Sequence, residues 1–461
     1  MTRTAVLVST YEMGRQPFGL ASAAAWLRAA GWDVRAIDAA KEKLRETMLA
    51  PADLIGFHLP MHTATRLAMP LVAAARRVNP TARVVAFGLY APLNEEWLRS
   101  IGVDAIFGGE FEEGLATFAA TEQPQRAQSL QRNLVSADSA ISAVKPDTLP
   151  RIRFLVPDRS GLPPLSKYAT LQMPDGARRL VGYTEASRGC RHLCRHCPVV
   201  PIYQGQFRIV QAEVVLADVG AQVAAGASHI TFGDPDFFNG PTHAMRIVTA
   251  LHDTHPGVSY DVTIKVEHLL RHRDLLPRLA ATGCAFVTSA VESVDDHVLA
   301  ILDKGHTRAD FLSAVELCRG AGVTLVPTFV AFHPWLTLDG YCDLLDTIEE
   351  FALVGCVAPI QLAIRLLVPE GSRLLALDEM RSCLGAFDPA TLTYRWRHPD
   401  PYVDELHDAV MQLVGTRLNA DRGVVFDEVS ALAHERAGRR MSTRPARDRA
   451  SVPYLNEPWY C

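Results

Sequence analysis

The most informative stretch of this chain is Thr184-Glu-Ala-Ser-Arg-Gly-Cys190-Arg-His-Leu-Cys194-Arg-His-Cys197-Pro198. It holds three of the nine cysteines within eight residues, spaced Cys-x3-Cys-x2-Cys, and the other six are scattered singly. The stretch follows a predicted strand, and a loop that starts at Gly189 and ends at Pro198 can curl so that three thiolates converge. Soft thiolates select zinc or iron–sulfur clusters.

The number of ligands bears on which metal such a loop holds. A closed zinc site takes four ligands, and cubane iron–sulfur clusters usually take four cysteines. Three cysteines with no obvious fourth leave one metal position open to a substrate or cofactor. The alternative is a structural zinc loop in which His192 or His196 supplies the fourth ligand. An odd cysteine count in a chain with no signal peptide argues against a disulfide framework.

Outward from the loop, residues 181–375 alternate short apolar strands with helices. The expected strands are Val181–Ser187, His229–Phe232, Ser259–Ile264, Phe286–Val291, Thr324–Val330 and Ile360–Leu366. Six such repeats predict a partial (β/α)6 TIM-like barrel. Its reactive groups would gather on the strand-to-helix loops at one end.

The rest of the chain completes an α/β fold class. Residues 1–120 alternate strands and helices as a Rossmann-like parallel sheet does, and ligands of such sheets lie beyond the carboxyl ends of the strands. Residues 121–180, rich in Gln, Ser, Arg and Pro, predict a linker with little structure of its own. Residues 376–461 predict a helical C-terminal region with a flexible tail.

The cysteine triad and its place after the first barrel strand closely resemble the radical S-adenosylmethionine superfamily. The resemblance implies a [4Fe–4S] cluster on Cys190, Cys194 and Cys197, whose open iron is chelated by the methionine moiety of S-adenosylmethionine. Reductive cleavage of that cofactor then yields a 5′-deoxyadenosyl radical. An electron donor such as flavodoxin or ferredoxin is also implied. The catalytic residues remain unknown at this level.

Two further motifs occur in the order that the same family shows. Phe232-Gly-Asp-Pro-Asp-Phe-Phe238 resembles the end of its second strand, and Ala290-Val-Glu-Ser293 resembles its Gly-x-Glu-Ser on the fourth. The resemblance implies that the cofactor is contacted by His196, Asp234, Glu292 and Ser293. His196 and Ala290 depart from the family, which usually has an aromatic residue and a glycine there. Isolated carboxylates of this kind are more often solvated or cap helices.

The N-terminal region resembles the cobalamin-binding domains attached to radical enzymes. The resemblance rests on the stretch Gln16–Val34 and on Gly109-Glu-Phe-Glu-Glu113. The Asp-x-His-x-x-Gly signature that supplies a cobalt-ligating histidine is absent, and His58 and His62 are not in its position. Cobalamin binding and a degenerate domain that only packs on the barrel both remain open. No Gly-x-Gly-x-x-Gly follows the first strand, which disfavours nicotinamide or flavin.

The chain ends in Asn456-Glu-Pro-Trp-Tyr-Cys461. Together with other segments, this end resembles a radical enzyme family whose tail reads Cys, then selenocysteine or Cys, then Ala-Glu-Pro. The resemblance implies that Cys461 is the first residue of that motif and that a selenocysteine codon follows it. An incidental terminal cysteine is the alternative.

The functional prediction is a radical S-adenosylmethionine enzyme that modifies a small molecule or peptide, with cobalamin-dependent methyl transfer as one outcome. The alternative is a zinc- or cluster-stabilised, non-catalytic binding or redox-sensing module. The net charge of −5 gives no electrostatic reason to expect nucleic acid or an anionic membrane as partner. No apolar run approaches the roughly 20 residues of a membrane span, and no signal peptide is recognised. A cytoplasmic location follows as the expectation.

Overall fold

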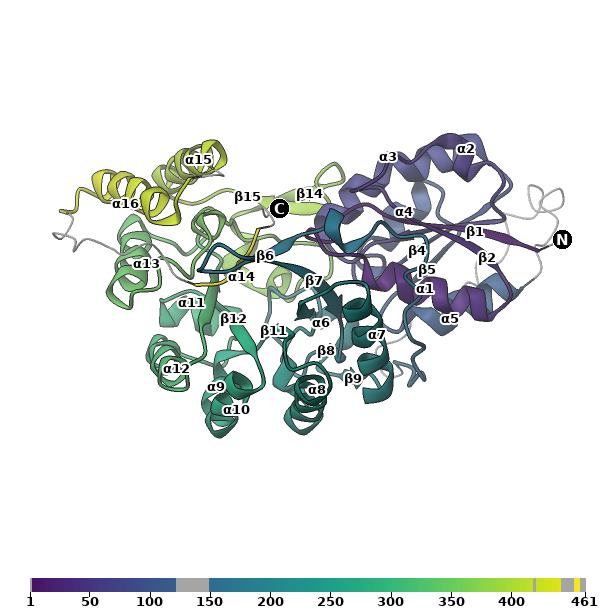
Figure 1. Ribbon diagram of the computed structural model, residues 1–461. Helices are drawn as coiled ribbons and strands as arrows, with labels where there is room; N and C mark the ends of the chain where they lie inside the picture. Colours follow the sequence, from purple (N-terminus) through teal and green to yellow (C-terminus); the bar gives the residue numbers. More distant parts are fainter. Residues whose placement is uncertain (1, 122–148, 418–419, 441–451, 457–461) are drawn as a thin grey trace.

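The computed structural model describes residues 2–121, 149–417, 420–440 and 452–456. They form an N-terminal α/β domain, a curled sheet of seven strands with helices on its outer side, and C-terminal helices beside that sheet (Figure 1). In these residues, no helix combines the length and the apolar character that crossing a bilayer requires.

The N-terminal domain is built on a five-stranded parallel sheet in the order β2-β1-β3-β4-β5. Its strands are β1 (Thr4–Ser9), β2 (Asp33–Asp38), β3 (Leu54–His58), β4 (Arg83–Phe87) and β5 (Ala105–Phe107). The inner strands have apolar central residues because helices bury both faces. This doubly wound order confirms the predicted Rossmann-like domain and places ligands at the carboxyl ends of the strands.

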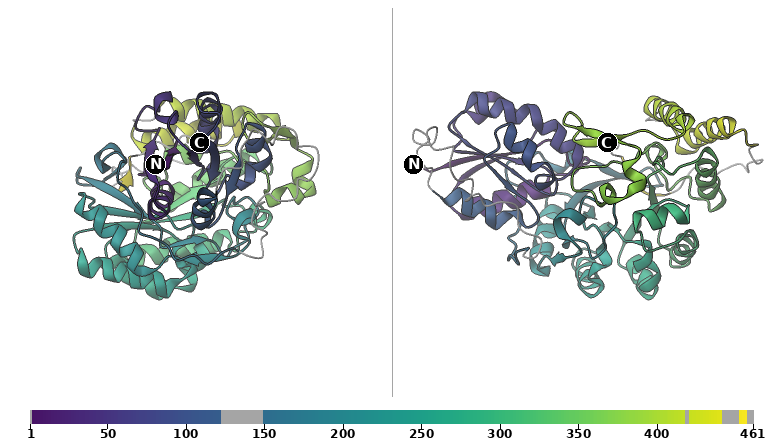
Figure 2. Two further views of the ribbon diagram at one scale, coloured as in Figure 1. Left: turned by 90° about the vertical axis from the view of Figure 1, so that its right-hand side faces the viewer. Right: turned by 180° about the vertical axis from the view of Figure 1, so that it is seen from behind.

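Helices cover the two faces of this sheet (Figure 2). On one face lie α1 (Phe18–Ala29) and α5 (Phe111–Ala120), which pack on each other. On the other lie α2 (Glu46–Leu49), α3 (His62–Val78), the 3-10 helix η1 (Pro92–Asn94) and α4 (Glu95–Ser100).

The second sheet has the order β13-β12-β11-β10-β7-β6-β16. Five parallel strands form the half-barrel: β7 (Arg178–Thr184), β10 (His229–Phe232), β11 (Ser259–Thr263), β12 (Cys284–Glu292) and β13 (Leu325–Phe329). Two antiparallel strands, β6 (Thr170–Gln172) and β16 (Tyr454–Leu455), extend its first edge. The expected strand positions are met closely from the first to the fifth repeat.

The elements between the strands form the outer layer of the half-barrel. They are α6 (Val200–Tyr203), α7 (Ala212–Ala224), η5 (Phe237–Asn239), α8 (Pro241–Thr254), α9 (Val266–Arg271), η6 (Arg273–Leu275), α10 (Leu276–Ala281), α11 (Asp296–Leu302), α12 (Arg308–Gly320) and α13 (Leu338–Glu350). A hairpin of β8 (Ser187–Gly189) and β9 (Phe207–Ile209) stands outside the main sheet and brackets the cysteine loop.

The sixth expected strand, Ile360–Leu366, is not formed. The chain there makes the 3-10 helix η7 (Pro359–Leu362), and a single parallel bridge joins Phe332 to Arg365. Pro359 begins that 3-10 helix just before the expected strand, and the bridge at Phe332 lies beyond the end of β13. The contact with β13 is made by a side chain, because the Phe329 amide donates to Gln361 Oε1 over 3.0 Å. The sheet is therefore a half-barrel of five parallel strands.

Two regions carry more strand than expected. The segment 121–180, predicted as a linker, contains η4 (Leu165–Lys167), β6 and the first residues of β7. The C-terminal region contains η8 (Arg373–Ala376), α14 (Asp378–Arg381), the hairpin β14 (Leu384–Asp388) with β15 (Thr393–Trp396), α15 (Pro401–Thr416) and α16 (Arg422–Ala437), before β16. Short strands of this kind are set by a distant partner, which periodicity does not show.

Candidate functional site

The cysteine loop is held in place at its start and in its middle. Gly189 ends β8 with a φ of +76°, and a methyl group there would lie 2.5 Å from the Gln206 carbonyl oxygen. In the middle of the loop, the Arg195 amide donates to the Leu302 carbonyl over 2.9 Å, and its guanidinium donates to Ile301 over 2.6 Å. The loop that carries the thiols is thereby fastened to the end of α11.

The three thiols lie in a buried environment. Cys190 and Cys194 are buried and Cys197 is partly so. Burial raises the pKa of Cys190 and raises that of Cys197 to about 12. Cys190 and Cys197 are therefore protonated in the metal-free protein, and a bound metal would be needed to hold these two as thiolates. Three sulfur donors on one loop fit a soft metal centre, and none of the other five described cysteines lies on that loop.

A mixed donor group stands next to the triad. Ligand atoms of Cys190, His192 and Asp236 all lie within 4.8 Å of one another. His268 Nδ1 lies 2.7 Å from Asp236 Oδ2, and His192 Nε2 lies 3.6 Å from the same oxygen. Burial acts to raise the pKa of Asp236, but the two imidazoles outweigh it and lower that pKa. A zinc ion held here would use one of the three cysteines, so an all-sulfur centre accounts for more of the loop.

Among the predicted cofactor residues, His196 and Glu292 come together. His196 Nε2 lies 3.1 Å from Glu292 Oε1, and the buried Lys304 donates to the same oxygen over 3.3 Å. Glu292 ends β12 in the left-handed region, with φ +72°. Burial alone would raise its pKa, but Lys304 and His196 hold it at about 2. The sequence did not single out Lys304 as a partner, although Lys304-Gly305 follows the motif.

Asp234 and Ser293 have structural contacts of their own. Asp234 is buried, accepts from the Ala186 amide over 2.9 Å and from Ser187 Oγ over 2.6 Å, and so supports the strand that leads into the loop. Burial raises its pKa to about 7. Ser293 Oγ accepts from the Asp295 amide over 3.1 Å. Cofactor contact by these two residues stays a prediction.

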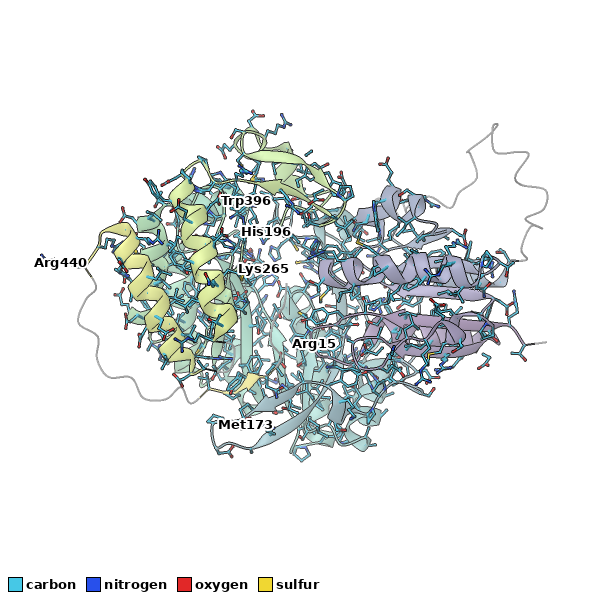
Figure 3. The ribbon with its side chains drawn as sticks, turned by 90° about the horizontal axis from the view of Figure 1, so that it is seen from above. Arg15, Met173, His196, Lys265, Trp396 and Arg440 are labelled. Atoms are coloured by element: carbon cyan, nitrogen blue, oxygen red, sulfur yellow. The ribbon has the colours of Figure 1, made fainter. Side chains whose placement is uncertain are left out.

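A cavity of about 920 Å³ extends from the carboxyl edge of the N-terminal sheet into the half-barrel. Ligand sites span roughly 300–1,000 Å³, so this one could hold a large ligand or two smaller ones together. Gly189 and Val199, which flank the thiols, line it. Figure 3 places Arg15, His196 and Lys265 in the central part of the molecule, between the N-terminal domain and the C-terminal helices.

The barrel wall of this cavity is polar. One threonine from each of four adjacent strands lines it: Thr231, Thr263, Thr288 and Thr328. Asp261, on β11, lies among them. Its Oδ1 accepts from Thr231 over 2.6 Å and pairs with His229 Nε2 over 2.8 Å. His229 Nδ1 in turn lies 2.7 Å from Ser259 Oγ, so a chain of hydrogen bonds ends on the carboxylate.

The opposite wall belongs to the N-terminal domain. Gly19, Gly88 and Gly109 line it without side chains, beside Met61 and Leu89. An open, largely apolar edge of this size fits a large flat cofactor such as cobalamin.

The two histidines of this edge have other neighbours. A methyl group on Gly19 would lie 2.2 Å from His58 Nε2, so that nitrogen faces α1, and His58 Nδ1 lies 3.4 Å from Glu12. His62 Nε2 contacts the Thr391 carbonyl oxygen.

A buried ion network joins the two domains, and sequence reasoning missed it. Arg188, just before the cysteine loop, lies 2.7 Å from Glu112, 3.4 Å from Glu110 and 2.7 Å from Glu185. Burial raises the pKa of Glu110 to about 7. The stretch Gly109–Glu113 thus reaches the loop through Arg188. The glutamates of this stretch are evident in the sequence, but their partner Arg188 is identified only in the structure.

The C-terminal strand closes part of the cavity wall. Tyr454, Leu455 and Asn456 line it, and Leu455 packs in a small cluster with Leu171 and Phe286. Cys461 and the predicted tail motif lie outside the described residues, and the selenocysteine hypothesis stays a prediction.

Comparison with known families matches two regions of the chain. Residues 184–348 match the radical SAM superfamily, and residues 4–119 match the B12 binding domain. Both domain predictions are thereby confirmed, on either side of the cavity described above.

Curated relatives match less than half of the chain. The tRNA-2-methylthio-N(6)-dimethylallyladenosine synthase of Chlorobium phaeobacteroides (strain BS1) is 26% identical over 185 residues, which are 38% of this chain and 41% of that protein. The ribosomal protein uS12 methylthiotransferase RimO of Methylococcus capsulatus (strain ATCC 33009 / NCIMB 11132 / Bath) is 26% identical over 225 residues, 42% of this chain and 49% of that protein. The chain therefore spans less than half the length of these relatives.

Solved structures match most of the chain in fold. The cobalamin-dependent S-adenosylmethionine radical enzyme OxsB superposes with a TM-score of 0.71 at 14% identity, over 94% of this chain and 72% of that one. The radical S-adenosylmethionine methyltransferase TsrM from Kitasatospora setae superposes with a TM-score of 0.66 at 15% identity, over 89% of both chains. At such identities the likeness establishes the shared fold.

Proposed function

We propose that this chain, in which a B12-binding domain precedes a radical S-adenosylmethionine domain, is an enzyme that modifies a small polar molecule in the cavity between the two. The observation that carries the proposal is the shared cavity. The residues that flank the three thiols and the carboxyl edge of the N-terminal sheet line the same space. Cofactors bound at the two walls would therefore meet one substrate.

Cys190, Cys194 and Cys197 would hold a [4Fe–4S] cluster, which when bound supplies one low-potential electron to S-adenosylmethionine. Next to them, His196, Glu292 and Lys304 form a buried, hydrogen-bonded group. Glu292 stays ionised there, because its pKa is about 2. Its carboxylate could accept from a bound amino group, and its fixed position would orient that group.

Gly19, Gly88 and Gly109, with Met61 and Leu89, would hold cobalamin at the N-terminal wall, where it would supply a methyl carrier. His58 and His62 are engaged with Glu12, Gly19 and Thr391. On these contacts, neither histidine is expected to ligate the cobalt of a bound cobalamin.

The substrate would sit against the threonine-lined wall of the half-barrel. Asp261 receives hydrogen bonds on Oδ1, and no described residue donates to its Oδ2. An acceptor that faces a cavity selects a donor, such as an amine or hydroxyl group. The substrate class we infer is a small molecule or peptide that carries such a group. A tRNA, as named for the Chlorobium relative, is less favoured because the net charge is −5.

Anaerobic reconstitution of the full chain tests the proposal. We expect about four irons and four sulfides per chain, binding of hydroxocobalamin, and either 5′-deoxyadenosine or S-adenosylhomocysteine after addition of S-adenosylmethionine and a reductant. Flavodoxin or ferredoxin is the expected natural donor, and the cytoplasm the expected location. In Cys194→Ala the iron and the product should both be lost.

Other outcomes would identify the alternatives. Zinc without iron after strictly anaerobic purification would indicate a structural metal loop. An intact cluster that never cleaves S-adenosylmethionine would indicate a redox-sensing module.

A further inference from the structure

A buried lysine contacts one of the three thiols. Lys265 follows β11 at the start of α9, and its side chain is almost fully buried. Its Nζ lies 3.7 Å from Cys194 Sγ, which is within hydrogen-bonding distance for sulfur. The two residues are 71 positions apart, so the contact exists only in the folded barrel.

In the described part of the chain, Lys265 forms no ion pair with a carboxylate. The other lysine near the thiols, Lys304, is also buried, but it is paired with Glu292 over 3.3 Å. Burial of an unpaired ammonium group is costly, so buried lysines nearly always have an anionic partner. Among the residues that the structure describes, the Cys194 sulfur is the hydrogen-bond partner found for the Lys265 ammonium group.

The neighbouring histidine does not compete for this role. His306 is buried, and its ring faces the Val291 backbone, which acts to raise its pKa. Burial, together with Lys304 and Lys265, lowers its pKa to about 4, so it stays neutral. Lys265 is therefore the cation in hydrogen-bonding contact with Cys194, while Lys304 acts on the same thiol through space.

We propose that Lys265 is a positioning residue that donates an N–H···S hydrogen bond to the Cys194 thiolate and thereby raises the reduction potential of the cluster on the triad. The inference rests on the proposed function. Reduction adds one negative charge, part of which lies on the sulfurs. A cation and an N–H donor at a sulfur stabilise the reduced state more than the oxidised one, and the low dielectric of the buried loop strengthens this effect.

The test is a potentiometric titration of the reconstituted full chain, followed by the EPR signal of the reduced cluster, without S-adenosylmethionine. In Lys265→Met the equilibrium constant for one-electron reduction should fall at least tenfold, which is 59 mV more negative. Lys265→Gln keeps a donor without the charge and should fall in between. Lys265→Arg should stay near the wild type.

Lys167→Met is the matched control, because Lys167 is exposed in η4 and carries the same charge without touching a thiol. Its potential should equal that of the wild type. Iron and sulfide per chain confirm that each variant holds its cluster. If Lys265→Met does not assemble a cluster, the potentials of Lys265→Gln and Lys265→Arg still test the proposal.

An unchanged potential in Lys265→Met and Lys265→Gln with full iron content would overturn the inference. In that case, weaker binding of S-adenosylmethionine would assign the ammonium to the carboxylate of that cofactor instead. A wild-type protein that assembles no cluster would overturn the proposed function as well, so the two failures are distinguishable.

Discussion

At the scale of single residues, the site is controlled by buried charges whose partners come from other elements. Lys304 and His196 lower the pKa of Glu292, so this carboxylate stays ionised. Burial raises the pKa of Glu110, although Arg188 is near. The difference follows from competition: Arg188 is shared among three carboxylates, and Lys304 serves one.

Glu110 should make stability depend on pH. Its pKa rises from 4.5 to about 7 on folding, so the folded state binds the extra proton and stability falls as pH rises through this window. Glu110→Gln should match the wild type at pH 4 and be more stable at pH 8, by at most on the order of 3 kcal/mol. Urea unfolding at both pH values measures this.

Glu112→Gln is the contrasting variant. Glu112 is the nearest carboxylate on the N-terminal domain to Arg188, at 2.7 Å, and it also accepts from Ser22 over 2.7 Å. Loss of the Glu112 carboxylate should destabilise the protein at pH 8, because Arg188 and Ser22 lose this partner. Equal pH profiles for Glu110→Gln and the wild type would contradict the assignment.

His58 should not ligate cobalt. Its two ring nitrogens face Glu12 and Gly19. Bound cob(II)alamin should therefore show no splitting from a histidine nitrogen in its EPR spectrum, and His58→Ala should leave that spectrum unchanged. A nitrogen splitting that disappears in His58→Ala would show that the histidine reorients to bind the metal.

At the scale of elements, the hairpin of β8 and β9 decides whether the cysteine loop can form. Gly189 is its critical position, because its backbone is left-handed and Tyr203 lies where a side chain would be. Gly189→Ala should therefore lose most of the iron after reconstitution while the N-terminal domain stays folded. Iron analysis and cobalamin binding measure the two parts separately.

Gly220→Ala is the matched control for that variant. Gly220 lies inside α7 with open space around it, so alanine should keep full iron and add up to roughly 1 kcal/mol of stability. Normal iron content in Gly189→Ala would show that the loop tolerates a shifted hairpin.

At the scale of the whole molecule, three distant parts of the chain enclose one cavity. The carboxyl edge of the N-terminal sheet, the half-barrel and the strand β16 each contribute lining residues. The strand β16 is held by β6, with Leu455 opposite Leu171, and the Asn456 side chain accepts from the Thr170 amide over 2.8 Å.

Removal of residues 452–461 should uncover β6. We expect faster hydrogen exchange in Thr170–Gln172 and a melting temperature lower by a few degrees, because the edge strand loses its partner and Leu455 leaves its cluster. A chain that ends at Asn456 keeps β16 and should exchange like the wild type. Equal exchange in the two shortened chains would show that the strand does not hold this edge.

The amino-acid sequence alone predicts the properties that depend on residues close together along the chain. Alternating apolar runs place the five strands of each parallel sheet, because burial on both faces demands them, and the spacing of Cys190, Cys194 and Cys197 identifies a soft metal loop. The predicted sixth strand was wrong, because an apolar run has the composition of a strand whether it joins the sheet or, as at Pro359–Leu362, forms a 3-10 helix.

The contacts between polar groups that are distant in the sequence depend on the tertiary structure. Lys265 reaches Cys194 across 71 positions, Arg188 reaches Glu110 across 78, and Asp261 completes its chain of hydrogen bonds through His229 on another strand. Periodicity predicts which side of a strand is buried, but the partner of a buried charge depends on how strand ends are brought together. The three cysteines can be recognised in the sequence, whereas the charged residues around them come together only when the chain folds.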